Sequence, residues 1–272
     1  MGRFISWGFV WIIDKMVVDY RILDRIDKKK SVIERDPGYY LKVYRAVKSK
    51  LKRSANIHSY WMENPRLRKS ILEETGQKDS RGLKRLAKEG ICDLITAWEY
   101  LHNQVEDSED MSFITPRNVL DVGSRVEPKI NMGFRSLRAS LGLRNYVPPN
   151  PVKVPDLIEE FCYNVRESDL HPIESAINCH LHIAGIQPFL DGNKRTGRIF
   201  QDTILYSNGY PPGLILISDR EKYIDKLENA LVAVRDKDLD GQRDFFNYLA
   251  ENIDLTLSRI VKDMKQGKRD VA

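Results

Sequence analysis

The sequence has few of the residues that build disulfide-rich or membrane-spanning proteins. It contains only three cysteines, Cys92, Cys162 and Cys179, in 272 residues. They are scattered, odd in number and set in apolar helical patterns, which excludes a disulfide framework and predicts reduced core thiols in a cytoplasmic protein. The N-terminal apolar run, residues 4–13, is shorter than the about 20 residues that cross a bilayer, and no small-residue cleavage site follows it.

Two interpretations of this N-terminal run stay open. It could pack on the protein's own core or on a partner subunit, or it could attach to a membrane surface through Trp7 and Trp11. The short length favours packing.

Charge is weakly biased, because 44 Lys and Arg residues face 39 Asp and Glu residues, a net charge of +5. Apolar residues make up 42% and charged residues 31%, which is typical of a soluble globular chain. A mildly basic protein suits anionic ligands. Nucleic acid is not expected as a partner, because no recognition helix or aromatic and basic strand pattern is present.

Strand patterns are scarce, and most of the chain has apolar residues at helical spacing. The one exception is residues 133–149, which contain Gly142, lack a helical stripe and end near a proline pair. This segment predicts a short β-hairpin or an ordered flap. The fold class is therefore all-α with a short hairpin flap, and the clearest helical patterns cover residues 81–103, 155–165, 172–186, 220–234 and 243–264.

The stretch HIAGIQPFLDGNKRTGRIF, residues 182–200, predicts an anion site between two helices. Pro188 ends the first helix, and Gly192 permits backbone angles that allow several N–H groups to face one point. The N-terminus of the next helix adds positive potential. Arg195 and Arg198 suit a polyphosphate, and Asp191 is a hard oxygen ligand that fits Mg²⁺ shared with phosphates.

Each residue taken singly also fits a polar turn between helices, with Asp191 and Asn193 as caps. The Asp-Gly-Asn run, the preceding Pro-Phe pair and the Arg-x-x-Arg spacing together favour the anion site.

The same stretch resembles the signature loop of the Fic-domain family, His-Pro-Phe-x-Asp/Glu-Gly-Asn-Gly/Lys-Arg with a second arginine three residues later. The similarity extends over residues 54–234, including the flap and the helix before the loop. It implies a helical core that binds ATP with Mg²⁺, and most members transfer AMP to a hydroxyl of a target protein.

The resemblance assigns nucleotide binding to five residues of the loop: Gly192, Asn193, Lys194, Arg195 and Arg198. The backbone at the glycine and asparagine would cradle the phosphates, and the arginines would hold the outer ones. Asp191 would bind the metal, and Phe189 would anchor the loop in the core. Residues 133–147 would pair with an extended segment of the target protein.

The chain departs from the family at Gln187, which occupies the position of the histidine that takes the proton from the target hydroxyl. An amide can orient a hydroxyl but does not titrate in the usable range. Adenylylation is therefore expected to be weakened or altered. His180 and His182 are the nearest substitutes, but they are expected to be core histidines because a base must lie within hydrogen-bond reach of its proton.

Residues 59–64, SYWMEN, match a second family pattern, the inhibitory helix Ser/Thr-x-x-x-Glu-Gly/Asn. Glu63 would pair with Arg198 and occupy the guanidinium meant for the terminal phosphate. Ser59 would complete the motif. The alternative is an exposed helical glutamate before a helix stop at Asn64 and Pro65.

Three units are expected: an N-terminal helical arm (1–53), a Fic domain (54–235) and a C-terminal helical extension (236–272). Three functions stay open, namely a weakened protein adenylyltransferase, a catalytically inactive nucleotide-sensing binding module, and transfer of a different phosphate-containing group. A target protein at the flap is the expected partner. Its identity, self-modification, the acceptor residue and assembly into homo-oligomers cannot be read from the sequence.

Overall fold

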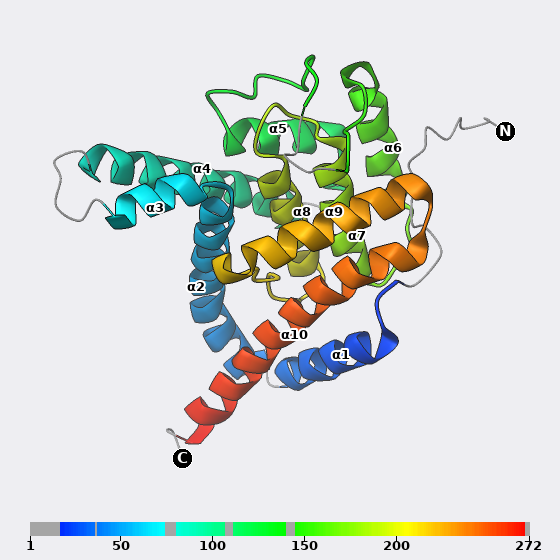
Figure 1. The fold of residues 1–272 in the computed structure, drawn as a ribbon. Helices are drawn as coiled ribbons and strands as arrows, with labels where there is room; N and C mark the ends of the chain where they lie inside the picture. Colours follow the sequence, from blue (N-terminus) through cyan, green and yellow to red (C-terminus); the bar gives the residue numbers. More distant parts are fainter. Residues whose placement is uncertain (1–16, 36, 74–79, 107–110, 140–144, 270–272) are drawn as a thin grey trace.

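A computed structural model describes residues 17–35, 37–73, 80–106, 111–139 and 145–269. In these residues the chain is helical, with short 3₁₀ turns at Pro151–Lys153 and Ile217–Asp219, and it contains no strand. Figure 1 shows the helices arranged around one central pair. The all-α prediction is confirmed for the described residues.

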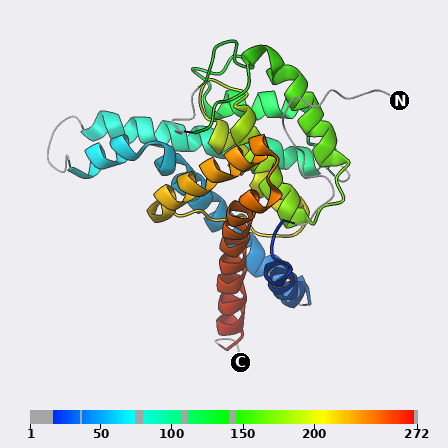
Figure 2. The same cartoon turned by 45° about the vertical axis from the view of Figure 1, so that its right-hand side comes forward.

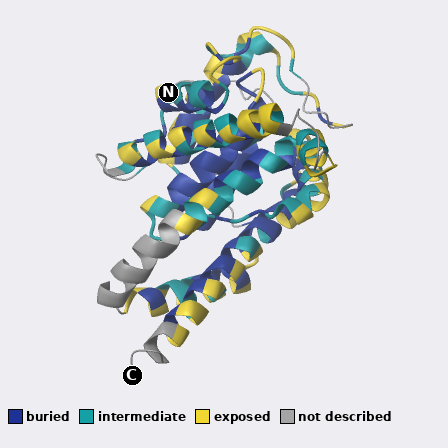
Figure 3. Ribbon diagram, turned by 90° about the vertical axis from the view of Figure 1, so that its left-hand side faces the viewer, coloured by how far each residue is buried: buried dark blue, intermediate teal, exposed yellow. Residues whose placement is uncertain are grey.

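The central helix is α7 (Pro172–Ile186), and α8 (Asn193–Ser207) packs along it. Every residue of α7 after Pro172 is buried, as expected for a helix that is apolar on most sides. Figure 3 shows this buried centre of the molecule. Pro172 occupies the first turn, where its missing N–H costs nothing, and the ring of His171 accepts the Ile173 N–H at 3.2 Å. The site at the end of α7 is thus built on a helix that is buried along almost its whole length.

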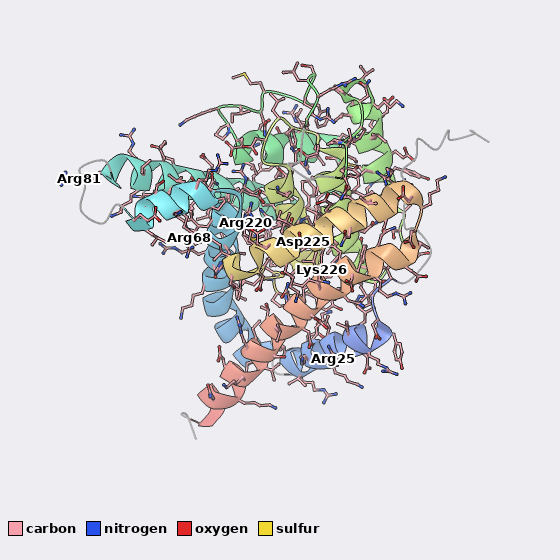
Figure 4. All side chains as sticks on the ribbon, viewed as in Figure 1. Arg25, Arg68, Arg81, Arg220, Asp225 and Lys226 are labelled. Atoms are coloured by element: carbon pink, nitrogen blue, oxygen red, sulfur yellow. The ribbon has the colours of Figure 1, made fainter. Side chains whose placement is uncertain are left out.

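Four helices pack around this pair and hold the site: α4 (Ser80–Glu106), α5 (Pro116–Val126), α6 (Val154–Arg166) and α9 (Arg220–Asp236). Helices α2 (Pro37–Glu63) and α3 (Pro65–Glu73) precede α4 in the chain, and both pack against it. Arg81 lies at the outer end of the α3–α4 pair, and Arg220 lies where α9 begins beside α2 (Figure 4). Helix α2 is continuous through residue 53, where the sequence predicts the border of the N-terminal arm.

The two ends of the described chain pack together. Helix α1 (Tyr20–Glu34) runs beside the long α10 (Leu239–Arg269), as Figure 2 shows. Asp254 of α10 pairs with Lys29 at 2.5 Å, and Glu174 of α7 accepts the N–H groups of Val17 and Val18 at 2.6 and 2.9 Å. The apolar run that raised the question of membrane attachment, with Trp7 and Trp11, lies outside the described residues. None of the described helices combines the length and the apolar character needed to cross a membrane.

The predicted hairpin is wrong for the part of the segment that the structure describes. Residues 133–139 and 145–149 form turns and bends without strand pairing. The physical reason is Arg135, whose guanidinium donates to the carbonyls of Leu137 and Pro149 at 2.9 and 2.6 Å. A side chain thus replaces the ladder of a hairpin, and the proline pair has no N–H to donate. Residues 140–144, with Gly142, lie outside the described part.

The prediction of three core thiols also needs correction. Cys162 and Cys179 are buried free thiols, but Cys92 is exposed on α4. Burial raises the pKa of the Cys162 thiol to about 12, so this side chain acts as a small apolar residue.

Candidate functional site

The loop between α7 and α8 has two residues in the left-handed conformation. Gln187 ends α7 with φ 52° and ψ 61°, and Gly192 precedes α8 with φ 81°. Pro188 follows the end of α7, as the sequence predicts. Asn193 is not left-handed but opens α8. The first N–H groups of α8 have no partner within the helix, and they mark the positive end of its dipole.

The side chain of Asn193 fastens the loop from inside. Its Oδ1 accepts the Phe189 N–H at 2.8 Å, and its Nδ2 donates to the Phe189 carbonyl at 2.9 Å and to Oε1 of Gln187 at 3.1 Å. Asn193 is buried, so its side chain supports the loop and only its backbone is placed at the helix N-terminus.

Phe189 lies fully buried under the loop against Gly123 of α5. A Cβ at Gly123 would approach the Phe189 ring to 2.1 Å, so only glycine leaves room for this anchor. Asn131 ties the same loop to α5, with Nδ2 donating to the carbonyls of Asp191 and Gly123 at 2.9 and 3.0 Å. Sequence reasoning missed Gly123 and Asn131, because neither stands in a pattern that distinguishes it from an ordinary turn or helix residue.

Arg195 is held by two carboxylates. Its side chain is buried and contacts Oε1 of Glu127 at 2.5 Å and Oδ1 of Asp191 at 3.2 Å. Asp191, the predicted metal ligand, has 59% of its side chain exposed at the mouth of the site. Glu127 follows the end of α5 and was not identified from the sequence.

Arg198 is buried and points to the other side, toward α2 and α9. It donates through Nε to the hydroxyl of Ser59 at 2.9 Å and through a terminal nitrogen to Oε1 of Glu63 at 2.9 Å. The other terminal nitrogen donates to the hydroxyl of Tyr223 at 3.2 Å. The structure therefore brings the predicted residues Ser59, Glu63 and Arg198 together, and it adds Tyr223.

Glu63 contacts two cations of the loop. Its second oxygen pairs with Lys194 at 3.0 Å, besides the contact with Arg198. Burial by itself raises the pKa of this carboxyl, but the charges and hydrogen bonds of Arg198 and Lys194 outweigh it and lower the pKa to about 2. Arg220 of α9 donates to the Met62 carbonyl at 2.7 Å and so holds the end of α2 in place.

Gln187 has its side-chain amide already engaged. Nε2 donates to the Ala184 carbonyl at 2.9 Å, and Oε1 accepts from Asn193 at 3.1 Å. Its backbone carbonyl accepts from Arg135 at 2.5 Å. The side chain is 5% exposed, and neither of its polar groups titrates.

The two neighbouring histidines are core residues. The ring of His180 contacts Gln201 at 2.8 Å and the Tyr223 hydroxyl at 3.0 Å, and burial followed by the charge of Arg198 lowers its pKa to about 3. His182 is 1% exposed and bonds through Nδ1 to the Asn178 carbonyl at 2.8 Å. Neither ring is among the residues that line the cleft of the loop.

Side chains of the α7–α8 loop and Glu63 surround a cleft that encloses about 340 Å³, including the part open to solvent. It is lined by Glu63, Gln187, Leu190, Asp191, Gly192, Asn193, Lys194 and Arg195. Among the described residues no group of three or more metal-binding side chains occurs. Asp191 alone fits Mg²⁺ that is shared with phosphates, because this ion is commonly held by one or two carboxylates and completes its shell with phosphate oxygens and water.

The arrangement can bind an anion with several charges. Backbone N–H groups, Lys194 and Arg195 line the cleft, and Arg198 adjoins them through Glu63. Carboxylates neutralise all three of these cationic side chains in this structure. A polyphosphate has to replace carboxylate contacts to reach the guanidinium groups.

Comparison with known proteins gives this loop a context. Residues 100–205 match the Fic/DOC family. Two curated relatives are each named Protein adenylyltransferase Fic. The protein from Culex quinquefasciatus is 30% identical over 224 residues, which cover 78% of this chain and 43% of the relative. The protein from Aedes aegypti is 28% identical over 222 residues, with 78% and 44% covered. The chain thus spans less than half the length of these two relatives.

Solved structures share the fold. A Fic domain containing signaling protein from Bacteroides thetaiotaomicron superimposes with a TM-score of 0.69 at 18% identity, covering 89% of this chain and 97% of that one. Fic-1 from C. elegans gives a TM-score of 0.67 at 17% identity, with 91% and 73% covered. At these identities the likeness shows the helical fold alone.

Proposed function

Because the chain belongs to the Fic/DOC family, we propose that its α7–α8 loop binds Mg-ATP and that it is a protein adenylyltransferase restrained at two points, Glu63 and Gln187. The observation that carries this proposal is the convergence of the α8 N-terminus with Arg195 and Arg198, the latter paired with Glu63. The names of the relatives at about 30% identity support the same chemistry.

In the proposed complex the phosphates lie over the N-terminus of α8. Their oxygens accept hydrogen bonds from backbone N–H groups, and the guanidinium groups of Arg195 and Arg198 hold the outer phosphates. Mg²⁺, held by Asp191, would neutralise part of the phosphate charge. Asp191 has to release Arg195 for this, which its exposed position allows.

Glu63 is the first restraint. Its carboxylate occupies the edge of Arg198 that would meet the terminal phosphate, and it also holds Lys194. Since two anions cannot share this buried edge, ATP aligns for transfer only when Glu63 is withdrawn.

Gln187 is the second restraint. AMP transfer forms a bond between the target hydroxyl oxygen and the α-phosphorus, breaks the bond to the β-phosphate oxygen and releases pyrophosphate. The hydroxyl proton needs an acceptor, and an amide cannot take it. General base catalysis is worth about 10²–10⁴-fold, so the proposed protein binds nucleotide but transfers AMP slowly.

A target protein would dock beside the loop, along the flap 133–147. Two apolar side chains of the flap, Leu137 at 63% and Val147 at 84%, are strongly exposed, and so is Met132 just before it at 91%. An extended peptide with apolar side chains could cover them. Since Arg135 already uses the carbonyls of Leu137 and Pro149, side-chain contacts would carry much of the binding.

The second candidate function is a nucleotide-sensing binding module without catalysis. The contacts of Gln187 favour it, because both groups of the amide are used to close α7 and to hold Asn193. In this case the amide is a structural replacement for the histidine and not a weaker catalyst.

Calorimetric titration with ATP, with and without Mg²⁺, tests the binding proposal. Arg195→Ala should weaken ATP binding at both Mg²⁺ levels, and Asp191→Ala should weaken it chiefly when Mg²⁺ is present. Arg243→Ala and Asp240→Ala on the exposed face of α10 are the matched controls. Unchanged affinity in both site variants would place the nucleotide elsewhere.

Covalent labelling separates the two candidate functions. The intact chain and a Glu63→Gly variant are incubated with tagged ATP and with proteins of a lysate. Slow labelling that depends on Arg195 supports the adenylyltransferase, and ATP binding without any labelling in either protein supports the sensing module.

A further inference from the structure

Tyr223 of α9 contacts the terminal nitrogen of Arg198 that does not contact Glu63. It is fully buried, its hydroxyl is 3.2 Å from a terminal nitrogen of Arg198, and the guanidinium carbon lies 5.5 Å from the centre of its ring. We propose that Tyr223, fixed by His180 and Gln201, is a positioning residue that holds Arg198 in place for the terminal phosphate once Glu63 is withdrawn. This inference rests on the proposed function.

The direction of each hydrogen bond follows from the chemistry of the groups. A guanidinium only donates, so the Tyr223 oxygen accepts from Arg198. The hydroxyl proton then goes to Nε2 of His180, 3.0 Å away, which must be unprotonated. The remaining ring proton is on Nδ1 and is donated to Oε1 of Gln201 at 2.8 Å.

The opposite orientation of the Gln201 amide does not fit. Its nitrogen would donate to Nδ1 of His180 and place the ring proton on Nε2. Tyr223 would then face two donors, the ring and Arg198, and its own proton would have no acceptor in this group. In the first orientation the Gln201 amide nitrogen is the one group of this set without a partner, whereas the flipped amide would leave both the tyrosine proton and the amide oxygen unpaired. Unpaired buried polar groups are costly, so the first orientation is favoured. A neutral ring is required in this arrangement, in agreement with the lowered pKa of His180.

The hydrogen bonds that join Tyr223, His180 and Gln201 do not involve Glu63 or any other residue of α2. The other contacts of Arg198 come from α2, through the hydroxyl and carbonyl of Ser59 and the carboxylate of Glu63. If α2 shifts, these contacts are lost together. Tyr223, His180 and Gln201 belong to α9, α7 and α8, and they remain as the buried support of the guanidinium.

The experiment compares ATP with AMP. In a Glu63→Gly background, Tyr223→Phe removes the hydroxyl and leaves the ring. Because Arg198 would meet the terminal phosphate, the affinity for ATP should fall about 10-fold more than the affinity for AMP, as for the loss of a hydrogen bond to a charged group. Tyr248→Phe, in a buried tyrosine of α10, is the matched control and should not change the ratio.

Two outcomes separate the proposals. If the Glu63→Gly variant binds no ATP, the proposed function is wrong and the role of Tyr223 falls with it. If this variant binds ATP but Tyr223→Phe weakens ATP and AMP equally, the binding proposal stands and the positioning role is overturned. An equal loss is what a general packing defect would cause.

A second measurement is made on the unmodified chain and uses a variant only to assign the signal. The chain has five histidines, and ¹⁵N-labelled histidine spectra distinguish the two neutral ring forms. His180, assigned by its absence in His180→Asn, should carry its proton on Nδ1 and should stay neutral down to at least pH 5. A proton on Nε2 would overturn the chain of hydrogen bonds and with it the positioning role.

Discussion

The two arginines of the loop lie three residues apart on α8, yet different parts of the chain hold them. Arg195 pairs with Glu127 after α5 and with the exposed Asp191 of its own loop. Arg198 pairs with Ser59 and Glu63, about 140 residues earlier in the sequence, on α2.

This difference separates two tasks. The partners of Arg195 belong to the loop and to the helix that anchors it, and Glu127 can keep its contact with Arg195 when Asp191 turns to Mg²⁺. The main partners of Arg198 lie on α2, which precedes the matched Fic/DOC region and also contacts Lys194 through Glu63. We infer that Arg198 is the arginine whose access is regulated, while Arg195 is part of the permanent binding surface.

The largest expected effect comes from restoring a base and withdrawing the restraint together. Gln187→His with Glu63→Gly should give self-labelling with tagged ATP about 10²–10⁴-fold above Glu63→Gly alone. Histidine tolerates the left-handed backbone of position 187 better than most residues. Gln187→His alone should label weakly because Glu63 still holds Arg198, so the double change exceeds the product of the single effects.

Gln187→Ala in the Glu63→Gly background is the control for this experiment, and it should label no better than Glu63→Gly. Strong labelling by the unmodified chain that disappears in Gln187→Ala would show that the glutamine itself supports transfer. Labelling that depends on His182 would mean that another base acts.

A second test concerns the burial of α8 next to Arg198. Asp202, one turn further along α8, accepts the Gly213 N–H at 3.1 Å, and burial raises its pKa from 3.8 to about 7. The folded chain therefore binds a proton that the unfolded chain has lost between these values, and this contribution to stability disappears as the pH rises through about 7. Asp202→Asn should raise the free energy of unfolding by about 4 kcal/mol more at pH 8 than at pH 4.

Chemical denaturation at both pH values measures this difference. Asp240→Asn, at an exposed position of α10, is the control and should show almost no change with pH. A difference between Asp202→Asn and the unmodified chain that is the same at pH 4 and pH 8 would contradict the burial argument.

The third test follows the carboxylate of Glu63 into acid. Its pKa is about 2 in the folded chain and 4.5 in an ordinary glutamate, so the stabilisation is present above about pH 4.5 and is lost as the pH falls toward 2. The unmodified chain should lose up to about 3 kcal/mol of its advantage over Glu63→Gln across this window. Other acid-sensitive groups, such as His180, are common to both proteins, so only the difference between the two denaturation curves is compared. A constant difference would show that the pair does not stabilise the fold.

The smallest effect tests the comparison of the arginines directly. Glu63→Gly should tighten ATP binding about 10-fold by freeing Arg198, whereas Glu127→Gln should change it less than about 3-fold because the amide oxygen can still accept from Arg195. A crystal of each variant with nucleotide should show the terminal phosphate on Arg198 only in Glu63→Gly. Equal ATP affinities and the same phosphate pose in both variants would remove the distinction between Arg195 and Arg198.

Much of the local structure could be predicted from the sequence. Apolar residues on most sides indicated the buried helix that the structure shows as α7, and Pro188 follows its end as expected. Ser59 and Glu63 are four residues apart in a helical stretch, so they share a face and can reach one partner. The hairpin prediction failed because the carbonyls of Leu137 and Pro149 bond to the side chain of Arg135, which no alternation pattern reveals.

The sequence by itself therefore determined the clearest helices, the turn at Gly192 and the set of charged groups in the loop, because spacing and backbone preference act between near neighbours. Only the tertiary structure decided that Glu127 pairs with Arg195 and that Tyr223 hydrogen-bonds to Arg198. It also decided that the amide of Gln187 hydrogen-bonds to Ala184 and Asn193. Such choices depend on which helices pack together. Glu63 and Arg198 are separated by 135 residues, and they meet because α2 packs against α8. Burial then gives the contact its strength, since a charge removed from water must find its partner within the fold.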